Sequence, residues 1–124
     1  MSHDALILFA HGARDPRWAE PLAAVADRVR ALAPGLRVEL AFLELMEPRL
    51  PDTVAALASD GVDRITLVPA FLGQGGHIRR DLPVLLDELR NRHAEVTIHL
   101  APTIGEVDAV LDAIAGFCVQ SHCR

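Results

Sequence analysis

Three side chains that can bind a metal ion and accept protons stand just after apolar runs of the sequence. His11 and His77 follow the first and third of these runs, and Glu44 ends the second. Imidazole and carboxylate groups are ligands of divalent transition metals, and both can act as proton acceptors. Parallel α/β sheets keep their ligand sites at the carboxyl ends of strands. If the three runs are strands of such a sheet, the sequence predicts that these residues converge on one metal-binding and catalytic site.

Equal intervals separate His11 from Glu44 and Glu44 from His77. Each interval is about the length of one βα unit, and the flanking residues differ, so we interpret the spacing as unit length rather than as a sequence repeat. All three residues are therefore expected at the same height of the sheet. The alternatives are a histidine that only caps a turn, for His11, and an ordinary loop histidine, for His77.

Strand and helix signals alternate along the chain, which indicates the order βαβαβαβα. Strands are expected at residues 5–10, 37–43, 64–71 and 95–100, and helices beginning after Asp15, at Pro51, at Ile78 and at Gly105. This alternation predicts an α/β fold: a flavodoxin-like three-layer sandwich with a four-stranded parallel sheet of order 2-1-3-4 and helices on both faces. Its switch point lies between the first and third strands, next to His11 and His77.

The first helix is expected to begin with Asp15 as its N-cap and Pro16 at its first position, and to stop at residues 34–35. Its apolar residues recur at three- and four-residue spacing. This spacing predicts one buried face made of Trp18, Leu22, Val25, Val29 and Leu32. On the fourth strand we expect one face made of Val96, Ile98 and Leu100. The last helix is expected to end at Phe117.

The composition indicates one domain without disulfide bonds. The chain has 124 residues, half of them apolar, and a formal net charge of −5, which argues against nucleic acid and anionic membrane surfaces as partners. Its two cysteines, Cys118 and Cys123, have no metal-finger spacing. No signal peptide or long apolar run is evident, so a cytoplasmic protein is expected. We expect a domain over residues 1–118 and a frayed tail over residues 119–124.

Further charged residues surround the proposed site. Glu47 competes with Glu44 for the carboxylate role, but Glu44 is nearer the strand end. Asp81 lies one turn after His77 and could orient its ring, and His99 could line the same cleft. Four arginines flank the two histidines and suit a ligand with several carboxylates, although each could equally be a surface charge: Arg14, Arg17, Arg79 and Arg80.

Several common site types are excluded by missing motifs. The glycine-rich segment 73–76 lacks the Gly-Lys-Ser/Thr of a phosphate-binding loop, and the first loop lacks GxGxxG. No GxSxG nucleophile elbow exists. Nucleotide and α/β-hydrolase sites are therefore not expected.

Three ordered motifs resemble the class II tetrapyrrole chelatases. Residues 8–14 (LFAHGAR) are similar to the opening His-Gly-Ser/Ala-Arg of that family, and residues 42–48 (FLELMEP) to its Phe-Leu-Glu-Leu-x-x-Pro segment. The third motif combines residues 68–72 (VPAFL) with residues 77–83 (HIRRDLP), and residues 102–105 (PTIG) are similar to a later family turn. The resemblance covers nearly the whole chain. Its nearest form is the short sirohydrochlorin cobaltochelatase of the CbiX-small type, which is related to the SirB-type ferrochelatases.

The resemblance implies a lyase-class enzyme that inserts Co²⁺, or next Fe²⁺, into sirohydrochlorin in cobalamin or sirohaem biosynthesis. It implies that His11 and His77 bind the metal and accept protons while Glu44 assists. No cofactor is implied beyond the substrate metal, which could be Co²⁺, Fe²⁺ or Ni²⁺. Long relatives contain two such domains in tandem, so a homodimer is implied for a single domain.

The residues themselves leave two other functions open. One is a non-catalytic module that carries a metal or tetrapyrrole. The other is a metal-assisted hydrolase, which is disfavoured because no further Asp or His cluster supplies the usual ligands.

Overall fold

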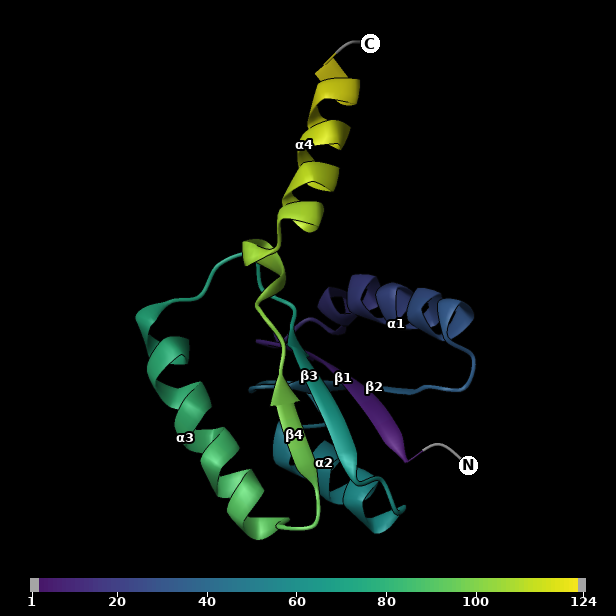
Figure 1. Ribbon diagram of the computed structural model, residues 1–124. Coiled ribbons are helices and arrows are strands. Elements are labelled where there is room, and N and C mark those ends of the chain that lie inside the picture. Colours follow the sequence, from purple (N-terminus) through teal and green to yellow (C-terminus); the bar gives the residue numbers. More distant parts are fainter. Residues whose placement is uncertain (1–2, 123–124) are drawn as a thin grey trace.

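The computed structural model describes residues 3–122, and the side chain of His77 lies outside that description. The centre of the protein is a parallel sheet of order β2-β1-β3-β4 (Figure 1). The strands are β1 (Asp4–Ala10), β2 (Arg37–Phe42), β3 (Arg64–Pro69) and β4 (Thr97–Leu100). The predicted α/β class, strand direction and strand order are confirmed.

The register aligns the strand ends that were predicted to carry the site. Leu8 of β1 pairs with Leu40 on one side and with Val68 on the other. At the carboxyl end, Ala10 pairs with Phe42. The loops that follow β1, β2 and β3 therefore begin at the same edge of the sheet.

One face of the sheet carries the main core beneath α2 (Leu50–Ser59) and α3 (Gly76–Arg92). Alternate residues of β1 point into it because side chains alternate between the two faces of a strand. The ring of Phe9 meets Phe71 edge-on, with centroids 5.7 Å apart. The largest fully buried side chains of this core include Ile7, Phe9, Leu50, Leu57, Ile65, Leu67, Leu86 and Leu89.

The opposite face is covered by α1 (Glu20–Leu32). Leu22, Ala26 and Val29 of this helix pack over Leu8 and Val38. Right-handed crossovers explain why helices lie on both faces of the sheet. The chain crosses the sheet from β1 to β2 in one direction and then reverses toward β3 and β4. Figure 1 shows α1 on one side of the sheet and α2 and α3 on the other.

The predicted buried face of the first helix is partly wrong. Leu22 and Val29 pack inward, but Trp18 and Leu32 are 73% and 86% exposed, and Val25 is exposed as well. The chain first forms a 3₁₀ turn, η1 (Pro16–Ala19), and the α-helix begins only at Glu20. A 3₁₀ helix has three residues per turn, so α-helical spacing does not extend back to Trp18.

Four strand limits also differ from prediction, and the first is that β1 begins one residue early, at Asp4. β2 ends at Phe42, β3 ends at Pro69, which has no N–H to donate, and β4 begins at Thr97. Val96 and Ile98 are buried as expected, whereas Leu100 is exposed.

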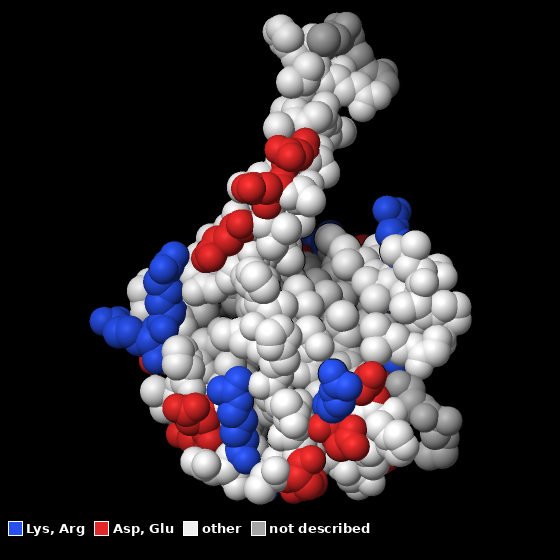
Figure 2. Space-filling model, in the orientation of Figure 1, with Lys and Arg blue, Asp and Glu red and all other residues white. Residues whose placement is uncertain are grey.

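The last helix stands away from the sheet. After η2 (Ile104–Glu106), α4 (Asp108–His122) projects from the domain and buries none of its residues (Figure 1). Residues 119–122 are helical, where we expected a frayed tail, and residues 123–124 lie outside the described part. Figure 2 shows acidic side chains on the half of α4 nearest the domain and none farther out. No helix within residues 3–122 is long and apolar enough to span a bilayer.

Gly12 lets the loops after β1 and β2 approach one another. Its φ of +97° is in the region that favours glycine, and a Cβ there would collide with the carbonyl oxygen of Glu44. The ladder extends past the strands, because Leu43 N donates to Ala10 O over 2.9 Å and Glu44 N to His11 O over 3.1 Å. These backbone contacts fix Glu44 beside His11.

The burial of Leu57 and the exposure of Leu32 predict that truncating these two side chains has unequal effects on stability. Leu57→Ala empties a fully buried position and should lower the free energy of unfolding by about 2–5 kcal/mol. Leu32→Ala removes an exposed side chain and should change it by less than about 0.5 kcal/mol. Urea denaturation followed by circular dichroism measures both. Equal losses would place Leu32 in the core and contradict the position of α1.

The close approach at Gly12 predicts that Gly12→Ala is destabilising. Positive φ alone costs a non-glycine residue about 1–2 kcal/mol, and the collision with Glu44 adds to that cost. Gly35→Ala is the matched control, because a Cβ at Gly35 meets nothing within 4 Å. The control should stay within about 1 kcal/mol of the parent. An unchanged free energy of unfolding in Gly12→Ala would contradict the loop geometry.

Candidate functional site

His11 and Glu44 meet at the carboxyl edge of the sheet, as the sequence predicted. The distance from His11 Nε2 to Glu44 Oε1 is 3.4 Å, and the two side chains are 47% and 50% exposed. Because both are half exposed, the carboxylate retains access to water and avoids the cost of burial without a partner. The pair is accessible to a ligand from solution.

The His11 ring has distinct surroundings at its two nitrogens. Nδ1 lies 3.3 Å from the carbonyl oxygen of Gly12. In the tautomer where Nδ1–H donates to this oxygen, Nε2 carries the lone pair and faces Glu44. Nε2 and Glu44 Oε1 can then share a proton or bind the same divalent ion.

A pocket of about 690 Å³ opens beside His11, which is one of its lining residues. It lies at the ends of β1, β2 and β3 and is bounded on one side by the start of α1. Its lining is mostly apolar and comprises Ala10, His11, Gly12, Ala13, Trp18, Pro21, Leu22, Phe42, Met46, Ala70, Phe71 and Leu72. The combination of a large apolar pocket with few polar groups is typical of small-molecule binding sites.

Trp18 is a wall of this pocket that the sequence analysis missed. It was assigned to a buried helix face, but its indole is largely exposed and borders the pocket. Pro21 was the available signal, because proline favours the first turn of an α-helix and marks the true start of α1. An exposed indole beside an apolar pocket can stack on a flat ligand.

The two arginines near His11 have different surroundings. Arg17 makes a bidentate pair with Asp15, with nitrogen–oxygen distances of 2.7–3.1 Å. Hydrogen bonds from the Arg17 side chain and backbone lower the pKa of Asp15, and the same side-chain bond raises the pKa of Arg17. Arg14 is exposed. Arg14 is therefore the better placed of the two to bind an anionic group.

The two candidate arginines at the start of α3, Arg79 and Arg80, are also exposed. Arg79 Nη2 lies 3.9 Å from Glu106 Oε1, a distance that leaves both groups hydrated. Arg79 and Arg80 stand in the first turns of α3, which begins at Gly76 after the N-cap Gly75.

For His77, the predicted third ligand, only the position of the backbone is described. The backbone of His77 lies in the first turn of α3, and its side chain lies outside the described residues. Asp81 is exposed one turn later, and its predicted contact with His77 therefore stays a prediction. Among the described side chains, no group of three or more His, Cys, Asp or Glu residues is placed to hold a metal ion. The observed constellation is the pair His11–Glu44.

Glu47 and His99, the two other candidates for this site, lie outside it. Glu47 borders a different pocket, beside Arg49, Asp52 and Leu85. His99 is exposed on β4 opposite Thr66 and is absent from the lining of the His11 pocket. Glu44 is therefore the carboxylate beside His11.

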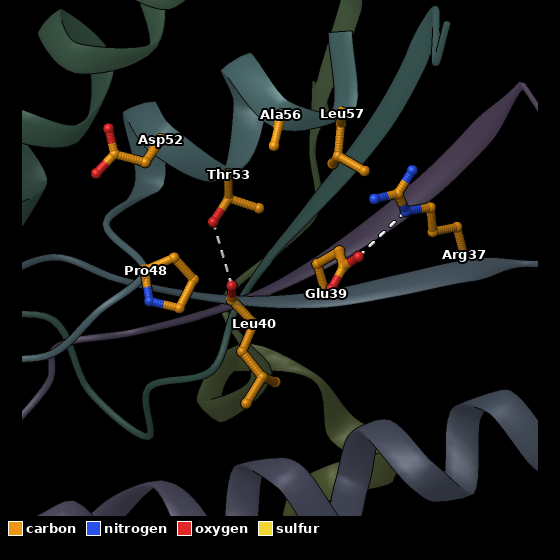
Figure 3. A pocket seen from close by; sticks show the side chains of 8 residues that line it. All are labelled: Arg37, Glu39, Leu40, Pro48, Asp52, Thr53, Ala56 and Leu57. Atoms are coloured by element: carbon orange, nitrogen blue, oxygen red, sulfur yellow. Dashed lines mark hydrogen bonds and ion pairs between the residues drawn. The ribbon is translucent and has the colours of Figure 1, made fainter. Parts of the chain in front are cut away.

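A smaller pocket of about 170 Å³ lies between β2 and α2 (Figure 3). Arg37 pairs with Glu39 at 3.1 Å and with Asp60 at 2.7 Å, and these carboxylates raise the pKa of Arg37. Thr53 Oγ1 donates to Leu40 O over 3.3 Å. Because these polar groups already pair with one another, they account for the attachment of α2 to β2 rather than for catalysis.

Comparison with solved structures gives close matches to this fold. A CbiX protein from Marinobacter aquaeolei VT8, described for cobalamin (vitamin B12) biosynthesis, superposes with a TM-score of 0.83 at 34% identity, covering 95% of this chain and 96% of that chain. The sirohydrochlorin chelatase SirB from Bacillus subtilis subspecies spizizenii, solved in complex with cobalt, gives a TM-score of 0.76 at 26% identity. That match covers 91% of this chain and 48% of the SirB chain.

Sequence comparison leads to the same family. A sirohydrochlorin cobaltochelatase from Methanopyrus kandleri is 38% identical over 82 residues, which are 66% of this chain and 57% of the relative. The chain thus spans less than two thirds of that relative's length. The CbiX family model matches residues 5–116. The chain therefore belongs to the CbiX family.

Proposed function

We propose that this protein is a sirohydrochlorin chelatase that inserts a divalent metal, Co²⁺ first and Fe²⁺ next, into the tetrapyrrole. It acts in the cytoplasm as a homodimer. The observation that carries the proposal is the His11–Glu44 pair, 3.4 Å apart, at an apolar pocket of about 690 Å³. The names of the CbiX and SirB relatives support the choice of substrate.

The pocket suits a flat macrocycle with charged edges. The tetrapyrrole ring lies against the apolar lining and stacks on Trp18, while its carboxylates remain near water. Arg14 is exposed near the pocket, and Arg79 and Arg80 are exposed on α3. Guanidinium groups bind carboxylates through paired hydrogen bonds and so orient the ring. Arg17 contributes to the site indirectly, through the turn that its ion pair with Asp15 stabilises.

Metal insertion must remove two pyrrole N–H protons. In the proposed reaction, His11 Nε2 accepts one proton and Glu44 accepts or relays the other, since their atoms adjoin. His77 serves with His11 as a nitrogen ligand that delivers the metal, and Asp81 orients His77. Nitrogen and oxygen ligands suit both Co²⁺ and Fe²⁺, so this ligand set accepts either ion.

The homodimer would rebuild a two-lobed enzyme. This chain covers 48% of the SirB chain, so two copies match its length. A second lobe would enclose the half-exposed pair and the macrocycle from the other side.

Removal of either proton acceptor should impair metal insertion. General acid–base groups contribute about 10²–10⁴-fold to rate, so His11→Ala and Glu44→Gln should lower kcat by amounts in that range. Glu47→Gln is the matched control and should leave kcat unchanged, because Glu47 borders another pocket. Absorption spectra of sirohydrochlorin with Co²⁺ at substoichiometric protein measure turnover. A stoichiometric spectral change without turnover would indicate a carrier and contradict the proposal.

Macrocycle binding should quench the fluorescence of Trp18, which is the only tryptophan in the chain. Stacking with the indole predicts saturable quenching by sirohydrochlorin in the absence of metal. Trp18→Leu should raise the dissociation constant for sirohydrochlorin about 5–150-fold. Stacking of a flat nucleic-acid base on an aromatic side chain is worth about 1–3 kcal/mol, and we expect a similar contribution for the macrocycle. Because this variant has no tryptophan, its dissociation constant is measured by absorption titration. Binding without quenching would place the macrocycle elsewhere.

A further inference from the structure

The loop after β3, residues 70–75, joins a wall of the pocket to the predicted metal ligand of α3. Phe71 and Leu72 line the pocket near the start of the loop, and His77 follows its end in the first turn of α3. Residues 73–76 include three glycines, and a Cβ added to any of them would meet nothing within 4 Å. Because glycine leaves the backbone free, holding such a loop in one conformation has a high entropic cost. The loop therefore needs contacts from a neighbouring segment.

The 3₁₀ turn η2 and its N-cap Thr103, which follow β4, supply those contacts. Gln74 of the loop donates a hydrogen bond to the Thr103 hydroxyl. Gly105 N donates to Phe71 O over 3.0 Å. Gly105 also approaches Leu72 so closely that a Cβ there would collide with the Leu72 backbone. The turn after β4 therefore holds the loop after β3 near its start and at its middle.

The Thr103 side chain serves the loop rather than its own turn. Thr103 is 4% exposed and is the N-cap of η2, but within the described residues its side chain makes no capping hydrogen bond. A threonine at an N-cap usually accepts a backbone N–H of the helix that follows. Here the hydroxyl accepts from Gln74 instead. Because a buried hydroxyl without a partner is costly, this bond couples the turn to the loop.

Gln74 is the middle of three points that hold this part of the chain. Phe71 packs edge-on against Phe9 in the core, and Ile78 packs against the same core. Gln74 lies between them, partly buried, on the hydrogen bond to the turn after β4. Loss of that bond would release the glycine-rich segment that leads into His77, while both ends stay attached to the core.

We infer that Thr103 and Gly105 are positioning residues for the reaction of the proposed function, on which this inference rests. Thr103 acts through Gln74 and holds the segment that leads into His77. Gly105 acts through its close approach to Leu72 and sets the wall of the pocket. Such placement matters because an error of about 1 Å in a reacting group can lower a rate about 10²-fold. Neither of these two described residues lines the pocket, so both act through the loop after β3.

Thr103→Val tests the role of the hydroxyl, because valine keeps the shape of threonine and removes its acceptor. It should lower kcat for insertion of Co²⁺ about 10–10²-fold and leave KM for sirohydrochlorin within about twofold, since the pocket lining is unchanged. Thr103→Ser restores the hydroxyl and should restore kcat. Thr97→Val makes the same change at an exposed position at the start of β4 and should leave kcat unchanged. Unchanged kcat in Thr103→Val, or Thr103→Ser as impaired as Thr103→Val, would overturn the inference.

Nitrogen-15 NMR relaxation measures the order of the loop without any turnover. The wild-type amides of residues 73–76 should have order parameters of about 0.85, and Thr103→Val and Gln74→Leu should each lower them to about 0.6. The double variant should lower them no further, because both single changes remove the same hydrogen bond. Order parameters that stay at the wild-type level in both single variants would overturn the inference.

Gly105→Ala tests the contact with Leu72. The added Cβ should displace the Leu72 backbone and raise the dissociation constant for sirohydrochlorin about tenfold, because small changes in an apolar pocket have effects of this order. Absorption titration without metal measures it. Gly35→Ala is the control, since a Cβ there meets nothing within 4 Å. Unchanged affinity in Gly105→Ala would overturn the role assigned to Gly105.

The NMR measurement separates this inference from the proposed function. Wild-type protein that shows no turnover of sirohydrochlorin and Co²⁺ refutes the proposed function. In that case a loop that loosens in Thr103→Val and tightens again in Thr103→Ser still supports positioning by the turn after β4. A loop that stays ordered in Thr103→Val overturns it, whether or not the wild-type protein turns over.

Discussion

The candidate site depends on parallel pairing between β1 and β2 that continues beyond the strands. The same ladder that aligns Ala10 with Phe42 goes on through the bonds from Leu43 to Ala10 and from Glu44 to His11. The loop positions of His11 and Glu44, the proposed proton acceptors, are therefore set by backbone hydrogen bonds. Gly12 makes this possible, because any larger residue would push the two loops apart. A site built in this way is preorganised for whatever ligand enters the pocket.

The constraint also explains how a carboxylate occupies an apolar segment. Glu44 follows β2 in a run of apolar residues, where a side chain buried without a partner would be costly. The backbone turns sharply after it, with φ of +68° at Leu45, which few non-glycine residues adopt. This turn leaves Glu44 half exposed beside His11. A strained residue directly beside a candidate proton acceptor is consistent with selection for function rather than for stability.

Periodicity and chain order were sufficient to predict the strands, their order and the meeting of His11 with Glu44. These features follow from local alternation and right-handed crossovers, which a sequence records directly. The exposure of Trp18 was not predictable from spacing, because a 3₁₀ turn changes the phase of the helix before Glu20. The path of α4 was not predictable either. Its many apolar residues suggest a buried helix, but α4 buries none of them against its own domain.

The pocket and α4 share a structural cause. Both border the loop after β3: Phe71 and Leu72 line the pocket, and the same two residues hold Gly105 at the base of α4. A displacement of the pocket wall and a displacement of the base of α4 would therefore act on the same two residues of one loop.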